Sequence, residues 1–79
     1  MTLENLDEID TMTTWRLNDH RHILHSLNTT VKAPESMSPE EVVLKVATKE
    51  ELNTMRLVVT TEPFHDGTRR PVIHIYERV

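Results

Sequence analysis

The chain has 79 residues, no cysteine and a formal net charge of −4. A chain of this length forms one domain at most, and without cysteine neither a disulfide bond nor a thiolate metal site can stabilise its small core. The acidic balance argues against a general nucleic-acid-binding protein, and no apolar run approaches the roughly 18 residues of a membrane span. The start of the chain lacks the basic and apolar regions of a signal peptide, so we expect a cytoplasmic protein with no membrane partner.

The net charge is concentrated at the N-terminus. The first ten residues hold four acids and no base, whereas residues 11–79 balance nine acids with nine bases. We expect residues 1–12 to form an acidic arm or a short helix, and residues 13–79 to form a single small α+β domain.

Residues 14–33 fit two interpretations. As a helix, their apolar side chains share one face with His20: Leu17, Ile23, Leu24, Leu27 and Val31. As strands, the segments TTWRLN and ILHSLNTTV pair around Asp19. Asn28, Thr29 and Thr30 have low helix propensity. We favour the helix and keep the pair of strands as the alternative.

A helix is expected to begin at Pro39. Ser38 is its N-cap, and Glu41 completes a capping box with it. The helix runs from 39 to about 47 and then either continues irregularly or restarts at the second capping box, Thr48 to Glu51, and reaches about 53.

The C-terminal residues 55–79 predict a β-hairpin. Residues 55–61 are rich in β-branched side chains, and residues 72–79 alternate, with Ile73 and Ile75 on the face opposite His74 and Tyr76. Asp66-Gly67 is a strong signal for a two-residue type I′ turn, which pairs residues whose numbers sum to 133, such as Arg56 with Glu77.

Pro63 conflicts with regular pairing near that turn. In this register it occupies a hydrogen-bonded site and has no N–H to donate. We therefore expect the ladder to end near Thr61 and Val72, and residues 62–71 to project as a partly irregular loop.

Two α+β architectures follow. In the favoured one, helices pack on the C-terminal antiparallel hairpin. Because an isolated two-stranded sheet is marginally stable, this arrangement favours a homodimer. The alternative is a ββαββ fold, in which two hairpins form a four-stranded antiparallel sheet with one helix.

The projecting loop is the candidate partner-binding site, through Phe64, His65, Arg69 and Arg70. Phe64 is the only phenylalanine, and phenylalanine with arginine is typical of interface centres. One competing interpretation is a plain hairpin tip, whose arginines protect the sheet edge from self-pairing. Another is a basic loop that binds the acidic N-terminal arm of its own chain or of a dimer mate.

The histidines do not predict a metal site. No single secondary structure places His20, His22 and His25 on one face, and a site would have to recruit His65 or His74. We therefore predict no metal and no cofactor.

Catalytic patterns are also missing from the sequence. There is no GxSxG motif and no cysteine, and one glycine cannot build a phosphate-binding loop. The sequence indicates a small non-enzymatic protein-binding or regulatory module, acting as a homodimer. The alternatives are a nucleic-acid-binding regulator that uses the arginine-containing hairpin loop, and a small His-dependent metal protein.

Overall fold

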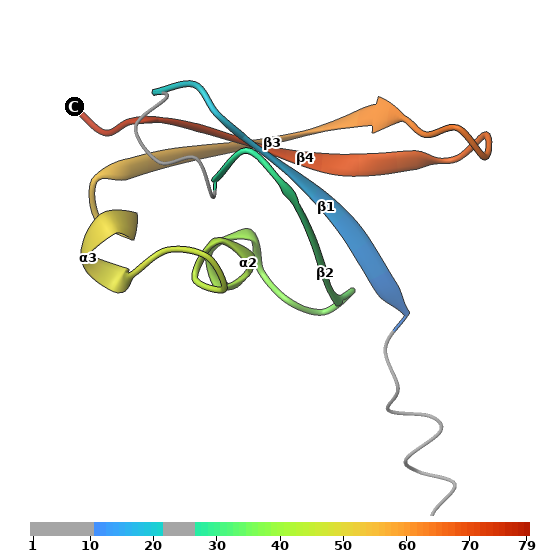
Figure 1. The fold of residues 1–79 in the computed structure, drawn as a ribbon, viewed down its shortest axis with the longest axis horizontal. Coiled ribbons are helices and arrows are strands. Elements are labelled where there is room, and N and C mark those ends of the chain that lie inside the picture. The colour runs from blue at the N-terminus through green and yellow to red at the C-terminus, as the bar shows by residue number, and fades with distance from the viewer. Residues whose placement is uncertain (1–10, 22–26) are drawn as a thin grey trace, which may run out of the picture.

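The computed structural model of the protein describes residues 11–21 and 27–79. These residues form four strands and two short helices, in the order β1 Met12–Asp19, β2 Thr30–Pro34, α2 Pro39–Val43, α3 Lys49–Leu52, β3 Met55–Pro63 and β4 Arg69–Glu77. The strands make one sheet in the order β2-β1-β4-β3 (Figure 1). Of the predicted arm, residues 1–10 lie outside the described residues, and Met12 already belongs to β1.

The sheet is mixed. β1 pairs antiparallel with β2 and β3 pairs antiparallel with β4, but the central strands β1 and β4 run parallel. The α+β class is therefore confirmed, while the favoured architecture of helices on a single hairpin is wrong. The alternative with two hairpins is closer, although it did not foresee the parallel centre or the second helix.

The helix favoured for residues 14–33 is wrong where the structure describes it. Trp15, Leu17 and Asp19 are buried at every second position of β1, and Val31 and Ala33 are buried in β2. Such alternation has the period of a strand that is covered on one face. Threonines in both segments add β propensity. Residues 22–26 of the predicted helix lie outside the described part.

The helical region divides into two, as the second capping box allowed. The Ser38 hydroxyl accepts from the Glu41 N–H, and the Thr48 hydroxyl accepts from the Glu51 N–H; each glutamate returns a bond to its cap. In the turns that follow α2, backbone hydrogen bonds join residues three apart instead of four, as in the bond from the Val46 N–H to the Val43 carbonyl. The chain then begins α3 at its own cap instead of placing Glu50 in the apolar stripe. No helix among the described residues is long and apolar enough to cross a bilayer.

Both helices belong to one side of the sheet. Val42 and Val43 of α2 are fully buried in the same cluster as the inward side chains of β1, β2, β3 and β4: Trp15, Leu17, Val31, Ala33, Met55, Ile73 and Ile75. The opposite face of the sheet is covered by no described helix (Figure 1). Ile73 and Ile75 thus share one face, as predicted, and that face is the core face.

The β3–β4 register differs from the predicted one by one residue. Met55 pairs with Glu77 and Pro63 pairs with Arg69, so the numbers of paired residues sum to 132. The Phe64 N–H donates to the Thr68 carbonyl, and Gly67, with a φ of 89°, donates to the Phe64 carbonyl. The turn is therefore a three-residue loop with its left-handed residue at Gly67, and not a two-residue type I′ turn.

This shift also removes the predicted conflict at Pro63. Hydrogen-bonded and non-hydrogen-bonded pairs alternate in an antiparallel ladder, and Phe64 with Thr68 is a hydrogen-bonded pair. Pro63 therefore occupies a non-hydrogen-bonded site, where no N–H is needed. The strands continue to Pro63 and Arg69, so the projecting loop predicted for 62–71 is wrong.

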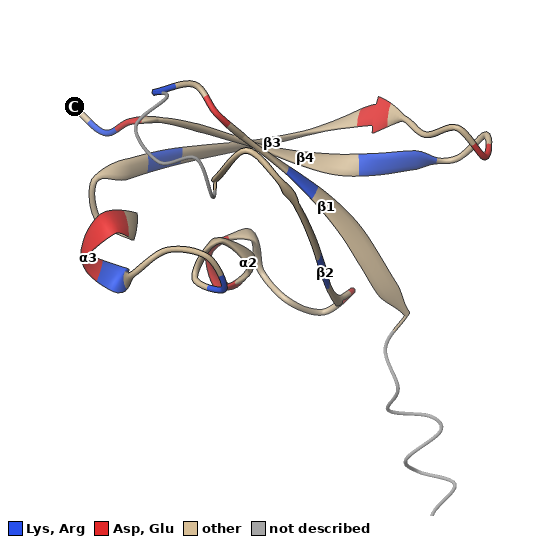
Figure 2. Ribbon diagram, in the orientation of Figure 1, with Lys and Arg blue, Asp and Glu red and all other residues tan. Residues whose placement is uncertain are grey.

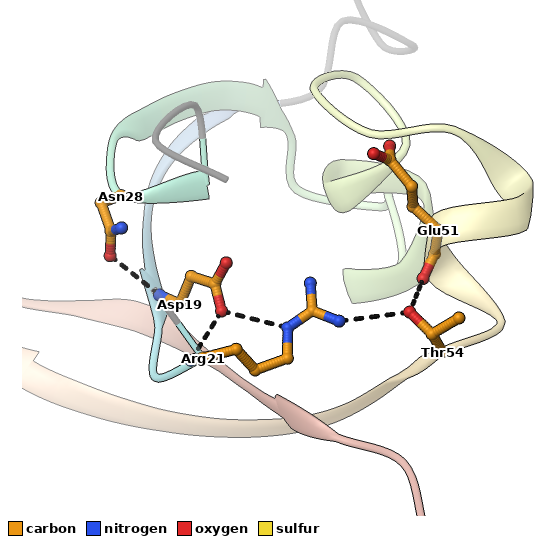
Figure 3. Close-up of polar contacts among 5 residues, drawn as sticks. All are labelled: Asp19, Arg21, Asn28, Glu51 and Thr54. Atoms are coloured by element: carbon orange, nitrogen blue, oxygen red, sulfur yellow. Dashed lines mark hydrogen bonds and ion pairs between the residues drawn. The ribbon is translucent and has the colours of Figure 1, made fainter. Parts of the chain in front are cut away.

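A buried ion pair joins the end of β1 to the helical layer (Figure 3). The Asp19 side chain is fully buried, and its Oδ1 accepts from Nε of Arg21 at 3.2 Å and from the Arg21 N–H at 2.9 Å. Arg21 Nη1 donates to the Thr54 hydroxyl, which donates to the Glu51 carbonyl at the end of α3. Since the Arg21 side chain is only 8% exposed, the pair is shielded from water.

We expect Arg21→Met to destabilise the fold by about 3 kcal/mol, because it leaves the Asp19 carboxylate buried without its cation. Urea denaturation measures the change, with Lys45→Met, an exposed position, as a control expected to stay within about 0.5 kcal/mol of the wild type. Equal stability of the two variants would mean that the ion pair does not hold β1 to the helical layer.

Candidate functional site

The uncovered side of the sheet, here called the open face, carries the side chains that alternate with the core positions. Four of them are basic, and Glu62 is the only acid that the described strands place there. The open face comprises Thr14, Arg16 and Asn18 of β1 with His20 directly after that strand, Thr30 and Lys32 of β2, Arg56, Val58, Thr60 and Glu62 of β3, and Arg70, Val72, His74 and Tyr76 of β4. The helices, in contrast, carry Glu40, Glu41, Glu50 and Glu51 (Figure 2).

One end of the open face carries a cluster of rings. His20 stacks on Tyr76, with ring centroids 4.5 Å apart and an interplanar angle of 3°, and it stacks on His74 at 5.1 Å. His20 Nε2 lies 2.8 Å from His74 Nδ1, and His74 Nε2 lies 2.8 Å from the Thr60 hydroxyl. The Arg56 guanidinium lies over Tyr76, 4.8 Å from the centroid. These contacts give the cluster a defined shape.

Two arginines and one carboxylate form the middle of the open face. Glu62 Oε2 lies 2.6 Å from Nε of Arg70 and 3.9 Å from Nε of Arg16. One negative charge thus faces two positive charges, which leaves a net positive charge at the centre of the sheet. The Arg70 guanidinium also lies over the Phe64 ring, 4.7 Å from its centroid.

The four predicted site residues are brought together only in part. Phe64 is half-buried and packs at a tilt on exposed His65, with ring centroids 4.3 Å apart. Arg69 and Arg70 belong to β4 and point to opposite faces, because successive side chains of a strand alternate. Arg69 donates from Nε to the Thr61 hydroxyl and from Nη2 to the Thr61 carbonyl, so only Arg70 joins Phe64 on the open side.

The hairpin tip is held by the Asp66 side chain. Its Oδ1 accepts from the Thr68 hydroxyl at 2.6 Å and from the Thr68 N–H at 3.0 Å. The hydroxyl bond first, and the backbone bond second, lower the pKa of Asp66 from its ordinary value of 3.8. Asp66 is therefore part of the turn's own structure.

The two central strands separate toward the hairpin tip and form what we call the fork. β1 and β4 pair only where Arg16 meets Val72 and onward to Asp19 and Ile75. Before those positions the strands diverge (Figure 1).

Two hollows share Arg70, one in the fork and one beside the paired part of β1 and the start of β2. One of about 240 Å³ lies between β1 and the hairpin end and is lined by Met12, Thr13, Thr14, Phe64, Asp66, Thr68, Arg69, Arg70 and Pro71. The other, of about 360 Å³, is lined by Arg16, Leu17, Asn18, Asn28, Thr29, Thr30 and Arg70. Six of the seven residues that line the second hollow carry guanidinium, hydroxyl or amide groups, which can bind an anionic group.

Sequence reasoning considered Arg16, with Arg21 and Lys32, as an extension of a basic patch around Arg69 and Arg70, but it did not place β1 beside β4. Arg16, Asn18 and His20 alternate with core residues, which was the available signal, but the favoured helix placed them elsewhere. The contact between His20 and His74 joins residues 54 positions apart, and only the parallel pairing of β1 with β4 creates it.

No group of three or more possible metal ligands exists among the described residues, and His22 and His25 lie outside them. No protein-family model matches the chain, and neither a curated protein nor a solved structure matches it.

Thr68→Val is expected to raise the pKa of Asp66 toward 3.8, because it removes the hydroxyl that donates to the carboxylate. A lowered pKa stabilises the fold above the ordinary value, and this contribution is lost as the pH falls through the folded value. The variant should therefore lose less stability than the wild type on acidification below about pH 4. Carbon-13 NMR of the Asp66 carboxyl measures the shift. In Thr30→Val, a control on β2, the pKa should not change.

Proposed function

We propose that the chain is a small non-enzymatic protein-binding module whose binding surface is the open face together with the tip of the β3–β4 hairpin. The observation that carries the proposal is the distribution of charge. Four bases and one acid lie on the open face, while α2 and α3 carry four acids and one base, Lys49 (Figure 2). A surface of this kind is complementary to an acidic region of a partner protein.

Arg70 and Phe64 are the proposed anchors of the interface. Glu62 and the Phe64 ring hold the Arg70 guanidinium before any partner binds. A side chain that is already ordered loses less conformational freedom on binding, which favours affinity. Arginine and aromatic side chains are also enriched among the residues that contribute most to interfaces.

Self-association is a separate proposal. The homodimer was predicted because a lone hairpin needs further strands, but one chain already supplies four. Sedimentation at several protein concentrations decides whether a dimer forms.

Selection from a random-peptide library against the wild type should enrich acidic peptides. We expect Arg16→Gln/Arg70→Gln to weaken their binding at least about tenfold, since each arginine can donate charge-assisted hydrogen bonds to a carboxylate. Fluorescence anisotropy of a labelled selected peptide measures the affinity.

The matched control is Lys45→Gln/Lys49→Gln, which removes the same charge from the helical region. If this variant loses as much affinity, total charge decides binding and the open face is not the site. Failure to enrich any peptide that distinguishes the two variants would also contradict the proposal.

A second candidate function is binding of single-stranded nucleic acid. The specific observation that favours it is the cluster of His20, His74 and Tyr76 beside the basic side chains of the open face. Proteins that bind single strands combine basic grooves with rings on which bases stack.

For this candidate, the affinity for a labelled single-stranded oligonucleotide, measured by anisotropy, should fall steeply with salt. The logarithm of the binding constant should fall against the logarithm of the salt concentration with a slope of about −0.7 for each phosphate contacted. Tyr76→Ala should weaken binding by about 1–3 kcal/mol if a base stacks on that ring. Absence of binding at low salt would exclude the candidate and leave the protein partner.

A further inference from the structure

The backbone of β1 presents unused hydrogen-bonding groups to the fork. The Glu35 N–H donates to the Thr11 carbonyl, and the Leu17 N–H donates to the Thr29 carbonyl. The backbone N–H and carbonyl groups of odd-numbered β1 residues therefore bond to β2. Those of even-numbered residues point toward β4, because the direction of these groups alternates along a strand. Within the described part of the chain, no strand pairs with Met12 or Thr14 on that side.

β4 faces the fork with Arg69. Since Phe64 and Thr68 form a hydrogen-bonded pair, the backbone N–H and carbonyl of Arg70 point toward β3. The backbone N–H and carbonyl of Arg69 therefore point away from β3, toward the fork. The ladder with β1 begins only at Val72, so among the described strands none pairs with Arg69 on this edge. Two strand edges thus face one another across a hollow of about 240 Å³.

The charges around the fork define what could enter it. Arg16 and Arg70 lie on its open-face side, and Arg69 lies on the other side. Exposed strand edges bind extended peptides by main-chain hydrogen bonds, and the flanking side chains select the sequence. Arg16 and Arg70 select acidic side chains, whereas the Arg69 guanidinium is bonded to Thr61 of β3. Asp66 at the hairpin tip and Glu62 beside Arg70 oppose a long acidic run.

We infer that the fork binds an extended acidic segment of a partner protein as an additional strand between β1 and β4. This inference rests on the proposed function and names the form of the partner. The added strand pairs with the edge at Thr14 on one side and at Arg69 on the other. It places an acidic side chain between Arg16 and Arg70 on the open face, and its next side chain points to the opposite face.

The test uses a fluorescein-labelled peptide in which Glu and Thr alternate, together with a matched peptide in which Lys replaces Glu. The full-length protein should bind the Glu peptide at least about tenfold more tightly than the Lys peptide. On saturation, the amide protons of Thr14 and Arg69 should exchange with solvent at least about tenfold more slowly, because they gain partners.

N-methylation of a central residue of the Glu peptide distinguishes strand addition from the binding of an acidic partner in another conformation. It should weaken binding about fivefold or more, since it removes one backbone donor and keeps the charge. If the methylated peptide binds equally well and Thr14 stays unprotected, the acidic partner remains supported but strand addition is wrong. If the Glu and Lys peptides bind alike or not at all, both the inference and the acidic partner are contradicted.

Thr14→Pro and Thr14→Val provide the matched protein variants. Proline removes the N–H that faces the fork and leaves the β2 ladder intact, whereas valine removes only the hydroxyl. The proline variant should bind the Glu peptide about fivefold more weakly than the wild type, and the valine variant should bind it as tightly as the wild type. Fluorescence of Trp15, the only tryptophan, reports whether each variant is folded. If Thr14 is protected without peptide in a concentration-dependent dimer, a second copy occupies the fork and the inference is overturned.

Discussion

The short parallel pairing of β1 with β4 is the contact on which the rest of the structure depends. It joins two antiparallel hairpins through only four residue pairs, from Arg16 with Val72 to Asp19 with Ile75. Because Leu17 meets Ile73 there, the two hairpins share one core face, on which α2 and α3 lie. The same pairing aligns Asn18 with His74, so the polar side chains also share a face. Core and candidate site are thus two consequences of one register.

The brevity of that pairing also creates the fork. The β3–β4 hairpin is paired along its whole length, from Met55 to Pro63, and β1 pairs with β2 from Met12 to Arg16. Strands twist relative to their neighbours, and two hairpins joined at only one end separate at the other. The separated ends expose main-chain groups that a longer parallel ladder would have satisfied. Arg16 and Arg70 flank the point of separation, so the geometry and the charge of the site have a common origin.

How much could be predicted depended on whether the signal was local. The capping boxes at Ser38 and Thr48 follow from side chains three residues apart, and both are confirmed. The alternation of Ile73 with His74 likewise identified the core face of β4. The prediction of the turn type was wrong because Asp66-Gly67 is compatible with both a two-residue and a three-residue loop. In the structure, the bonds between Phe64 and Thr68 distinguish the two, and neither residue is a turn signal in itself.

Non-local pairing could not be predicted from patterns within each segment. In residues 14–33, the apolar positions satisfied a helical period as well as a strand period, and the sheet decided between them by supplying β4 as a neighbour of β1. The same limit applies to the candidate site. Phe64 and Arg70 are close in sequence and were identified, but Arg16 reaches them only through the parallel register. Adding a strand in the fork would complete this sheet in the way that β1 and β4 begin it, because the edges at Thr14 and Arg69 continue the ladder that starts at Arg16. The groups that make the fold incomplete at this end are therefore the groups that would give a partner its affinity.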